Sequence, residues 1–314
     1  MRGIHLGKGR EMKKLSKFAV ILAIGILAAA LALVGCSSGS SSSSASASGS
    51  SASASASSAS ASASASSASA SASAASASSA AASDANGLGL QKDGVIVFAT
   101  VPDWPPFENM EGTDEPEGFD IALAKAVAEK LGLKAEFKSY GDFDAIFPAV
   151  QSATEVDAAI SGISITPERE ELVAFSNSYY TDDLAIAAMK SSAMSEDKLD
   201  SADITIAVQR GTTGNDYVKE NYPKAECMEL SNSTDCFAAM QAGQAQAVCT
   251  NKAVVEKMIA ESYSDAEVIK PIATDENFGI AVNKENAALR DAINGALEQL
   301  VADGTVNKLM EQYL

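Results

Sequence analysis

The sequence predicts an α/β fold from residue 87 onward, because apolar strand patterns and amphipathic helix patterns alternate along this part of the chain. A first set of strand–helix units runs to about residue 160, and a second set begins near residue 204. Repeated units of this kind are typical of parallel sheets. The stretch 87–314 is long enough to form two lobes, each with its own core.

Each element follows from a local pattern. The first expected strand is the apolar run 94–100, and a helix follows at 119–131. In that helix apolar residues recur every three or four positions from Ile121 to Leu131, with Asp120 as a possible N-cap and Gly132 just past the end. The same reasoning predicts further strands at 133–137, 156–160, 204–209, 226–230, 245–250 and 277–282. It predicts further helices at 143–151, 215–222 and 234–242, and a long helical pattern at 287–313 that is broken near residue 304.

The N-terminus has the pattern of an export signal. An uninterrupted apolar run, Phe18 to Gly35, follows the basic residues Lys13, Lys14 and Lys17. The run is long enough to span a bilayer, so a membrane anchor is the competing interpretation. The segment that starts at Met12 already looks like a complete signal peptide, and the codons before it can be rich in purines, as in a ribosome-binding site. We therefore hypothesise that translation starts at Met12.

The residues after the apolar run favour a lipid anchor over a membrane span. Leu33–Cys36 resembles the lipobox of bacterial lipoproteins, in which the peptide is cut before the Cys and the Cys is acylated, for example with palmitate. Residues 1–35 are then a lipoprotein signal peptide. Residues 36–86 are mostly Ser and Ala without an apolar face, which predicts a flexible tether with a mean reach of about 40 Å.

Charge and histidine content exclude several classes of function. The chain has a formal net charge of −18, and removal of residues 1–35 leaves 17 basic and 40 acidic residues, or about −23. Such a charge disfavours binding to nucleic acid or to anionic lipid headgroups. The single histidine, His5, lies in the removable segment, so Ser-His-Asp and Cys-His nucleophiles and His-ligated metals are excluded. We expect no metal, no cofactor and no catalytic residues.

Three cysteines remain after Cys36: Cys227, Cys236 and Cys249. Their spacing matches no zinc or redox motif, and their odd number leaves at least one unpaired within the chain. Export permits a disulfide, but we favour buried thiols that pack as small apolar residues.

The loop Ser161–Arg169 (SGISITPER) is the most informative motif of the chain. It follows the expected strand 156–160 and brings small residues, hydroxyl groups and one guanidinium to the strand end. A planar guanidinium beside exposed backbone N–H groups suits a carboxylate, because it can grip both oxygens at once. Taken alone, the motif is more simply interpreted as a strand-to-helix turn with a solvated arginine.

The loop belongs to an ordered set of short motifs that together are specific. The set comprises Ala99–Phe107, Gly118–Asp120, Asp142–Ile146, Ser161–Arg169, Phe175–Tyr180, Gly211–Thr213 and Phe278–Val282. In this order they resemble the polar amino-acid solute-binding proteins (substrate-binding lipoproteins) of bacterial ABC importers, across essentially all of residues 90–314. The resemblance implies a clamshell of two α/β lobes joined by two crossing hinge strands, as in periplasmic binding proteins. Lobe 1 would be about 88–186 and 277–314, lobe 2 about 190–272, and the crossings would lie near 187–190 and 272–276.

The resemblance also implies a binding site between the lobes. Arg169 would clamp the ligand carboxylate, Thr213 would contact it from the second lobe, and Trp104 and Phe143 would wall the ligand side chain. The free N–H groups where Gly211-Thr212-Thr213 opens a helix would favour an anion. The full set of expected ligand-binding residues is Trp104, Phe143, Ser161, Gly162, Ser164, Arg169, Thr212, Thr213 and Asn251. Gly162 replaces a residue that carries a hydroxyl in many relatives, which we expect to leave more room.

Two positions depart from the family pattern. Asn251 stands where an Asp usually pairs with the ligand α-ammonium, and Val101 stands where binders of cationic amino acids carry an acid. Both changes argue against lysine, arginine or histidine as ligand. We expect no carboxylate among the matching pocket positions. Acidic residues of the run Glu108–Glu117 could compensate for the two losses, but we interpret this run more simply as a solvated loop.

We therefore expect a lipid-anchored monomer on the extracytoplasmic face of the cell membrane. It would bind a polar or neutral amino acid, or a related small carboxylate, and deliver it to an ABC permease. An enzyme that resembles the cyclohexadienyl dehydratases of the same fold, and a ligand sensor for a partner protein, are the alternatives.

Overall fold

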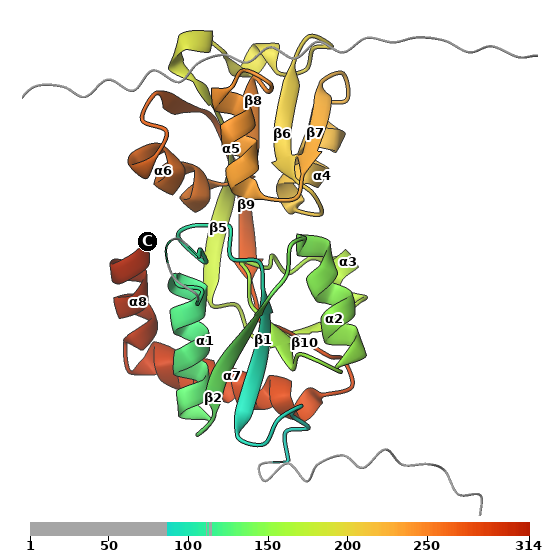
Figure 1. Cartoon of the computed structure of the whole chain (residues 1–314), viewed down its shortest axis with the longest axis vertical. Helices are drawn as coiled ribbons and strands as arrows, with labels where there is room; N and C mark the ends of the chain where they lie inside the picture. Colours follow the sequence, from blue (N-terminus) through green and yellow to red (C-terminus); the bar gives the residue numbers. More distant parts are fainter. Residues whose placement is uncertain (1–86, 111, 113–114) are drawn as a thin grey trace, which may run out of the picture. The chain divides into compact units, whose positions relative to one another are not determined.

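The computed structural model describes residues 87–314, apart from 111 and 113–114 (Figure 1). The described residues belong to one compact unit of the chain. The predicted signal peptide at 1–35, the start at Met12, the lipidation of Cys36 and the tether at 36–86 lie outside them. Within the described part, no helix combines the length and the apolar character that a bilayer crossing requires.

The first lobe is built on a five-stranded sheet in the order β2-β1-β3-β10-β4. Strand β1 pairs in parallel with β2 and β3, whereas β10 is antiparallel to both β3 and β4. The strands are β1 (Val95–Thr100), β2 (Lys134–Ser139), β3 (Ala158–Ala159), β4 (Ala174–Phe175) and β10 (Ala281–Val282). The helices are α1 (Phe119–Lys130), the 3-10 turn η1 (Phe143–Ala145), α2 (Ile146–Ser152), α3 (Pro167–Glu170), α7 (Ala287–Ala302) and α8 (Thr305–Tyr313).

The second lobe is built on a five-stranded sheet in the order β7-β6-β8-β5-β9. Strand β6 is parallel to β7 and β8, whereas β5 is antiparallel to β8 and β9. The strands are β5 (Tyr180–Met189), β6 (Thr205–Gln209), β7 (Glu226–Leu230), β8 (Ala247–Asn251) and β9 (Ala266–Phe278). The helices are η2 (Lys190–Ser192), η3 (Glu196–Lys198), α4 (Thr213–Asn221), α5 (Ser233–Gln241) and α6 (Lys252–Glu261).

The predicted α/β class is confirmed, but several elements differ from the expected ones. Strand β4 was not predicted, β5 and most of β9 were expected only as crossings near 187–190 and 272–276, and the expected strand 277–282 is divided between β9 and β10. Each sheet is mixed rather than purely parallel, because antiparallel strands complete both of them. Helix α6, which buries Val254, Val255 and Met258, was not among the predicted elements. The long C-terminal pattern does break at Gly304, whose φ of 78° lies in the left-handed region that favours glycine.

Strands β5 and β9 run between the two lobes (Figure 1). They pair antiparallel from Tyr180 and Phe278 to Met189 and Ala266, with a register shift between Asp182 and Leu184. From Leu184 onward β5 is also paired with β8 in the second sheet. The chain thus enters the second sheet before 187–190, where the first crossing was expected.

The start of helix α1 differs from the sequence prediction. Asp120 is not its N-cap, because the helix begins at Phe119 and Gly118 occupies the cap position. Gly118 has a φ of 126°, and a Cβ there would lie 2.3 Å from the carbonyl oxygen of Phe107. The close approach of these two backbones turns Asp120 inward, where its side chain is fully buried.

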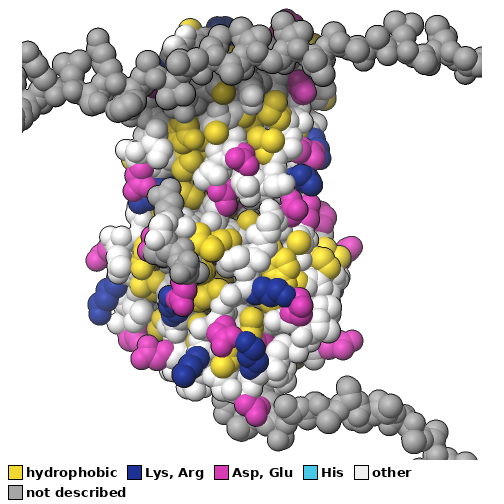
Figure 2. All heavy atoms as spheres, viewed as in Figure 1, with side chains coloured by type: hydrophobic (Ala, Val, Ile, Leu, Met, Phe, Trp, Pro, Cys, Tyr) yellow, Lys and Arg dark blue, Asp and Glu magenta, His cyan; other side chains and the backbone are white. Residues whose placement is uncertain are grey.

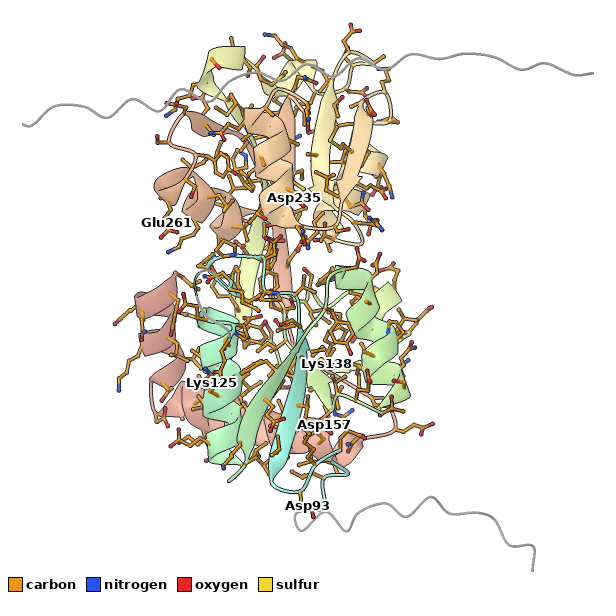
Figure 3. All side chains as sticks on the ribbon, viewed as in Figure 1. Asp93, Lys125, Lys138, Asp157, Asp235 and Glu261 are labelled. Carbon is orange, nitrogen blue, oxygen red and sulfur yellow. The ribbon has the colours of Figure 1, made fainter. Side chains whose placement is uncertain are left out.

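Buried aromatic residues pack in the first lobe around the end of β9. Phe107, Phe119 and Phe278 are fully buried, and the Phe107 ring lies 6.1 Å from that of Phe119 and 5.4 Å from that of Phe278, centroid to centroid. Phe107 is thus a core residue. The buried carboxylate of Asp157, at the lower end of the first lobe in Figure 3, accepts hydrogen bonds from the backbone N–H groups of Gln91 and Val97, both at 2.7 Å. It fixes the chain where β1 begins.

The surface carries its acidic and basic side chains interspersed. Figure 2 shows Asp and Glu next to Lys and Arg over the visible face of both lobes, with apolar side chains scattered among them. The ion pairs are solvent-exposed, as between Lys130 and Asp303 at 2.8 Å, so each contributes little to stability.

Candidate functional site

All nine residues expected at the site line one pocket. They are joined there by three residues that were not predicted as ligand contacts: Val101, Glu108 and Gln209. The pocket has a volume of about 10 Å³, which is space for a single water molecule. In this structure the two lobes are therefore closed on each other.

The pocket forms where several parallel strands end. Val101 and Trp104 follow β1, and the segment 161–164 follows β3. On the second lobe, Gln209 ends β6 and Asn251 ends β8. The carboxyl ends of parallel strands gather loops at one edge of a sheet, and ligands of open α/β folds bind there. This geometry explains why residues far apart in sequence meet.

Arg169 is held in a buried position by the short helix α3. Thr166 caps this helix by accepting from the Arg169 N–H at 3.3 Å, and Pro167 provides the first helical residue. The guanidinium donates to the carbonyl of Ser164 at 2.8 Å and to the carbonyl of Gly211, in the other lobe, at 3.1 Å. Among the described residues no Asp or Glu oxygen lies within 4 Å of it.

Burial lowers the pKa of Arg169, while Glu276, Asp216 and Asp144 oppose that shift from a distance. An arginine remains charged in proteins even so. The site therefore contains a buried positive charge without a contacting anion, which is costly unless a ligand supplies one.

Phe143 supports the guanidinium. The Arg169 guanidinium carbon lies 5.1 Å from the ring centre of Phe143 and 5.5 Å from that of Phe147. The two rings meet edge to face at 5.6 Å. Phe143 thus lines the pocket as predicted, but it also stacks on the arginine, and a cation over an aromatic face is stabilised by the ring quadrupole.

Gly162 makes room for Trp104 rather than for a ligand. Its φ is 52°, and a Cβ built on it would lie 1.8 Å from an atom of the Trp104 ring. The indole itself is buried, packs on Phe107 and Phe278, and donates from Nε1 to the hydroxyl of Thr250 at 3.2 Å. Trp104 is therefore both a pocket wall and a contact between the lobes.

Ser161 belongs to a buried cluster of acids. Its hydroxyl donates to Glu108 Oε1 at 2.7 Å and accepts from the Val101 N–H at 3.1 Å. Next to it, Asp120 Oδ2 accepts from the Gly162 N–H at 2.6 Å and from the Tyr179 hydroxyl at 2.9 Å. Glu108 has no exposed surface, so its interpretation as part of a solvated loop is wrong.

Glu108 and Asp120 form a pair of buried carboxyl groups with raised pKa values. Burial raises the pKa of Glu108 well above its ordinary value, and the nearby Asp120 charge raises it further. Burial also raises the pKa of Asp120, to about 7. The two carboxyl groups interact closely, and each has one buried oxygen, Glu108 Oε2 and Asp120 Oδ1, that receives no hydrogen bond from a donor among the described residues. A proton on Glu108 would satisfy both oxygens, so burial and the neighbouring Asp120 favour the neutral form of Glu108.

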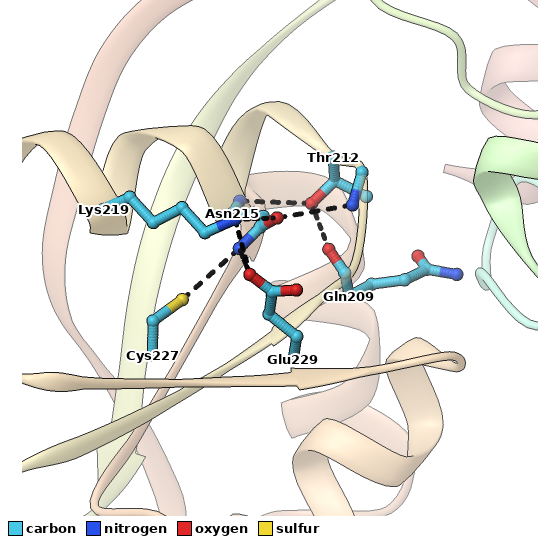
Figure 4. Close-up of polar contacts among 7 residues, drawn as sticks. Gln209, Thr212, Asn215, Lys219, Cys227 and Glu229 are labelled. Atoms are coloured by element: carbon cyan, nitrogen blue, oxygen red, sulfur yellow. Dashed lines mark hydrogen bonds and ion pairs between the residues drawn. The ribbon is translucent and has the colours of Figure 1, made fainter. Parts of the chain in front are cut away.

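The second lobe presents the N-terminus of helix α4 to the pocket. The Thr212 hydroxyl caps the helix by accepting from the Asn215 N–H at 3.2 Å and donates to the Gln209 carbonyl at 2.8 Å. Because this hydroxyl already donates its only proton, Thr212 can donate to a ligand carboxylate only through its backbone N–H. Figure 4 shows how Asn215 fixes the helix to strand β7 through Glu229, at 3.3 Å.

Glu276 was missed as a site residue. Its Oε2 atom accepts hydrogen bonds from the Ser164 hydroxyl at 2.6 Å, the Thr213 hydroxyl at 2.9 Å and the Asn251 amide at 3.2 Å. The expectation of no carboxylate among the pocket positions is thus wrong for Glu108, which lines the pocket, whereas Glu276 lies behind the wall and accepts from three residues that line it. The signal for Glu276 was its place at the end of the expected crossing 272–276, where a side chain reaches both lobes.

The cysteines take no part in the site. Cys236 and Cys249 are buried free thiols, as predicted, and burial raises the pKa of Cys236 to about 12. Cys227 is a free thiol that is partly exposed. No group of three or more His, Cys, Asp or Glu residues in the described part of the chain is arranged to hold a metal ion.

Known proteins resemble this chain in sequence and structure. The family of bacterial extracellular solute-binding proteins, family 3, matches residues 96–314. The ABC transporter arginine-binding protein 1 of Escherichia coli is 30% identical over 69% of this chain and 90% of its own length. A glutamine-binding protein of a Bacillus subtilis ABC transporter is 32% identical over 64% of this chain and 73% of its own length.

Two solved structures are similar at the level of the whole fold. An ancestral arginine-binding protein bound to arginine superposes with a TM-score of 0.66 at 34% identity, covering 70% of this chain and 98% of that one. An ancestral amino acid-binding protein described as a precursor of cyclohexadienyl dehydratase gives the same TM-score and identity over 70% and 95% of the two chains.

Proposed function

The chain belongs to the bacterial extracellular solute-binding proteins of family 3, and we propose that it binds an amino acid with a polar, uncharged side chain. Proteins of this kind deliver amino acids to ABC importers. The observation that carries the proposal is the buried guanidinium of Arg169, which donates to two carbonyl groups and contacts no anion within the described residues. A ligand carboxylate is the group that it lacks.

The wall of the pocket favours an uncharged side chain. Val101 gives one part of the wall an apolar surface, and Trp104 adds an aromatic face. Glu108 also lines the pocket, and burial together with the nearby Asp120 raises its pKa, which favours the protonated form that offers hydrogen bonds without a negative charge. A neutral carboxyl group suits an amide and gives a guanidinium or ammonium group no opposite charge.

Ligand entry requires the lobes to separate, because a pocket of about 10 Å³ cannot hold an amino acid. Several hydrogen bonds join the lobes and must break, among them Arg169 to Gly211, Trp104 to Thr250, and the bonds of Asp103 with Ser233 and Thr234. A ligand that bridges the lobes then stabilises the closed state over the open one, which is the energetic requirement for ligand-driven closure.

The proposal is tested by a thermal-shift screen of the twenty L-amino acids followed by calorimetry. Ligands that bind only the folded state raise the melting temperature. We expect glutamine or asparagine to bind more tightly than arginine or lysine. Arg169→Ala should abolish binding, while Arg290→Ala, which removes an exposed arginine paired with Asp291, should leave it unchanged. A wild-type affinity in Arg169→Ala would refute the site, and a preference for arginine would refute the ligand class.

We also propose that the receptor is anchored by lipid on Cys36 and held on the extracytoplasmic face by residues 36–86. The apolar run before Cys36 and the Ser/Ala composition after it support this. Cys36→Ser should release the protein from the membrane fraction and abolish its labelling by palmitate. A variant that remains membrane-bound would indicate a different anchor.

One observation favours a second function, that of a dehydratase-like enzyme. A protonated, buried carboxyl group at a pocket wall, such as Glu108, is a suitable general acid. The structural similarity to a dehydratase precursor points the same way. The test is to incubate the protein with a cyclohexadienyl substrate and to follow the ultraviolet absorbance of an aromatic product. If wild-type protein binds amino acids but forms no product, the dehydratase function is excluded and the receptor function remains.

A further inference from the structure

The site contains two opposite charges that do not contact each other. Arg169 has no Asp or Glu oxygen within 4 Å, and Glu276 has no Lys or Arg nitrogen within 4 Å, among the described residues. Glu276 is nevertheless the carboxylate with the largest electrostatic influence on Arg169. The two charges are thus near neighbours that stay unpaired.

The hydrogen bonds of Glu276 place its carboxylate where both lobes meet. It extends from β9, and one oxygen accepts from Ser164 in the first lobe and from Thr213 and Asn251 in the second. All three donors line the pocket. The other oxygen accepts no hydrogen bond from the described residues, and the side chain is only partly exposed.

This arrangement gives Asn251 a physical role. Its Nδ2 atom donates a hydrogen bond to Glu276 at 3.2 Å. An ionised Asp side chain at position 251 could not donate this hydrogen bond, because a carboxylate only accepts. An Asp at position 251 would face a second carboxylate at hydrogen-bonding distance, and two like charges so close cannot both stay ionised without cost. The amide at position 251 and the carboxylate at position 276 therefore form a matched pair.

We propose that the Glu276 carboxylate is the partner of the ligand α-ammonium group, in place of an acid at position 251. This inference rests on the proposed function, because it requires an amino acid as ligand. In an α-amino acid the ammonium and carboxylate groups are carried by adjacent carbon atoms. A ligand whose carboxylate contacts Arg169 and Thr213 brings its ammonium group to the neighbourhood of Thr213 and Ser164, where the Glu276 oxygens lie.

The test compares Glu276→Gln with wild type by calorimetry. Each of the twenty L-amino acids that binds wild type is measured beside its analogue in which hydrogen replaces the α-amino group. Glu276→Gln should lower the affinity for amino acids about tenfold or more, since the charge-assisted hydrogen bond to the α-ammonium group becomes a neutral one. The affinity for the deamino analogues should stay unchanged, because they carry no α-ammonium group. Circular dichroism and melting curves establish that the variant is folded.

A matched control and a rescue sharpen the test. Glu267→Gln makes the same change at an exposed position of the same strand and should leave affinity unchanged. Asn251→Asp in the Glu276→Gln background exchanges donor and acceptor and restores one negative charge. This double variant should recover most of the lost affinity for amino acids.

Three outcomes would overturn the inference. The first is unchanged or tighter binding of amino acids by Glu276→Gln, while Arg169→Ala still abolishes binding. Glu276 would then compete with the ligand for the carboxylate-binding groups, and the proposed function would stand without this inference. Equal loss for amino acids and their deamino analogues would show a structural role. If none of the twenty amino acids binds wild type, the proposed function and this inference both fail.

Discussion

Gly162 and Trp104 are in such close contact that any side chain at position 162 must displace the indole. A Cβ at Gly162 would lie 1.8 Å from Cζ3 of Trp104, and the glycine φ of 52° is itself unfavourable for other residues. The space that the glycine leaves is filled by the protein's own tryptophan. This contact fixes the wall of the pocket and the indole that reaches the second lobe.

Gly162→Ala should therefore lower stability and move Trp104. We expect a loss of about 1–3 kcal/mol in the free energy of unfolding, from overpacking and from the positive φ. Trp104 is the only tryptophan of the chain, so a red shift of its fluorescence emission reports the displacement directly. Gly295→Ala is the control, because Gly295 lies within α7 with open space around it and should be neutral or stabilising. Equal behaviour of the two variants would contradict the contact.

Thr250→Val should weaken ligand binding, although Thr250 itself does not line the pocket. The Trp104 Nε1 to Thr250 hydroxyl bond, 3.2 Å long, joins the two lobes and exists only when they are closed. Valine has nearly the same shape but accepts no hydrogen bond, which leaves a buried indole N–H unpaired at a cost of about 1 kcal/mol or more. We expect affinity to fall about fivefold or more, and Thr250→Ser to retain it. Calorimetry that finds the two variants equal would exclude this contribution to closure.

Phe143→Leu should weaken binding of every carboxylate ligand by a similar factor. The ring lies 5.1 Å from the Arg169 guanidinium, and its loss removes an interaction of about 0.5–2 kcal/mol that holds the guanidinium in place. The factor should be the same for amino acids with short and long side chains. A loss that grows with side-chain length would instead show that Phe143 acts mainly as a wall for the side chain.

The Glu108–Asp120 pair should make stability depend on pH. Both folded-state pKa values are raised, so the folded protein binds more protons than the unfolded chain between the ordinary carboxyl range and about pH 7. The free energy of unfolding should therefore fall as pH rises through this window. Urea unfolding at several pH values measures the slope.

Glu108→Gln separates this pair from the general effect of charge. The amide can still accept from Ser161 and donate to Asp120, but it removes one titrating carboxyl. The net charge of the protein becomes more negative with pH in both proteins, so the difference between their slopes isolates the pair. We expect a shallower slope in the variant; parallel slopes would mean that the raised pKa of Glu108 does not contribute to the pH dependence.

The sequence could predict much of the fold because most elements carry their pattern locally. The apolar stripe of α1 and the apolar run of β1 each specify an element without reference to distant residues. The nine candidate residues were found for a related reason, since short motifs at strand ends retain their order. Asp120 was misassigned as an N-cap because its partners, Gly162 and Tyr179, are 42 and 59 residues away.

The two missed carboxylates also owe their setting to distant partners. Glu108 lies in an acidic run, and only Ser161, 53 residues further on, shows that it is buried. Glu276 lies on a strand that alternates exposed and partly buried residues, and its donors are 25 to 112 residues away. No local pattern distinguishes such residues from solvated acids.

The position of β10 has a consequence for the order in which the protein can fold during synthesis. In the first sheet β10 lies between β3 and β4, and β4 has no other neighbouring strand in that sheet. Residues 281–282 leave the ribosome only after all of the second sheet's strands have been made. The second sheet can therefore assemble as a continuous stretch of chain, whereas the lobe whose synthesis begins first must wait for its last strand.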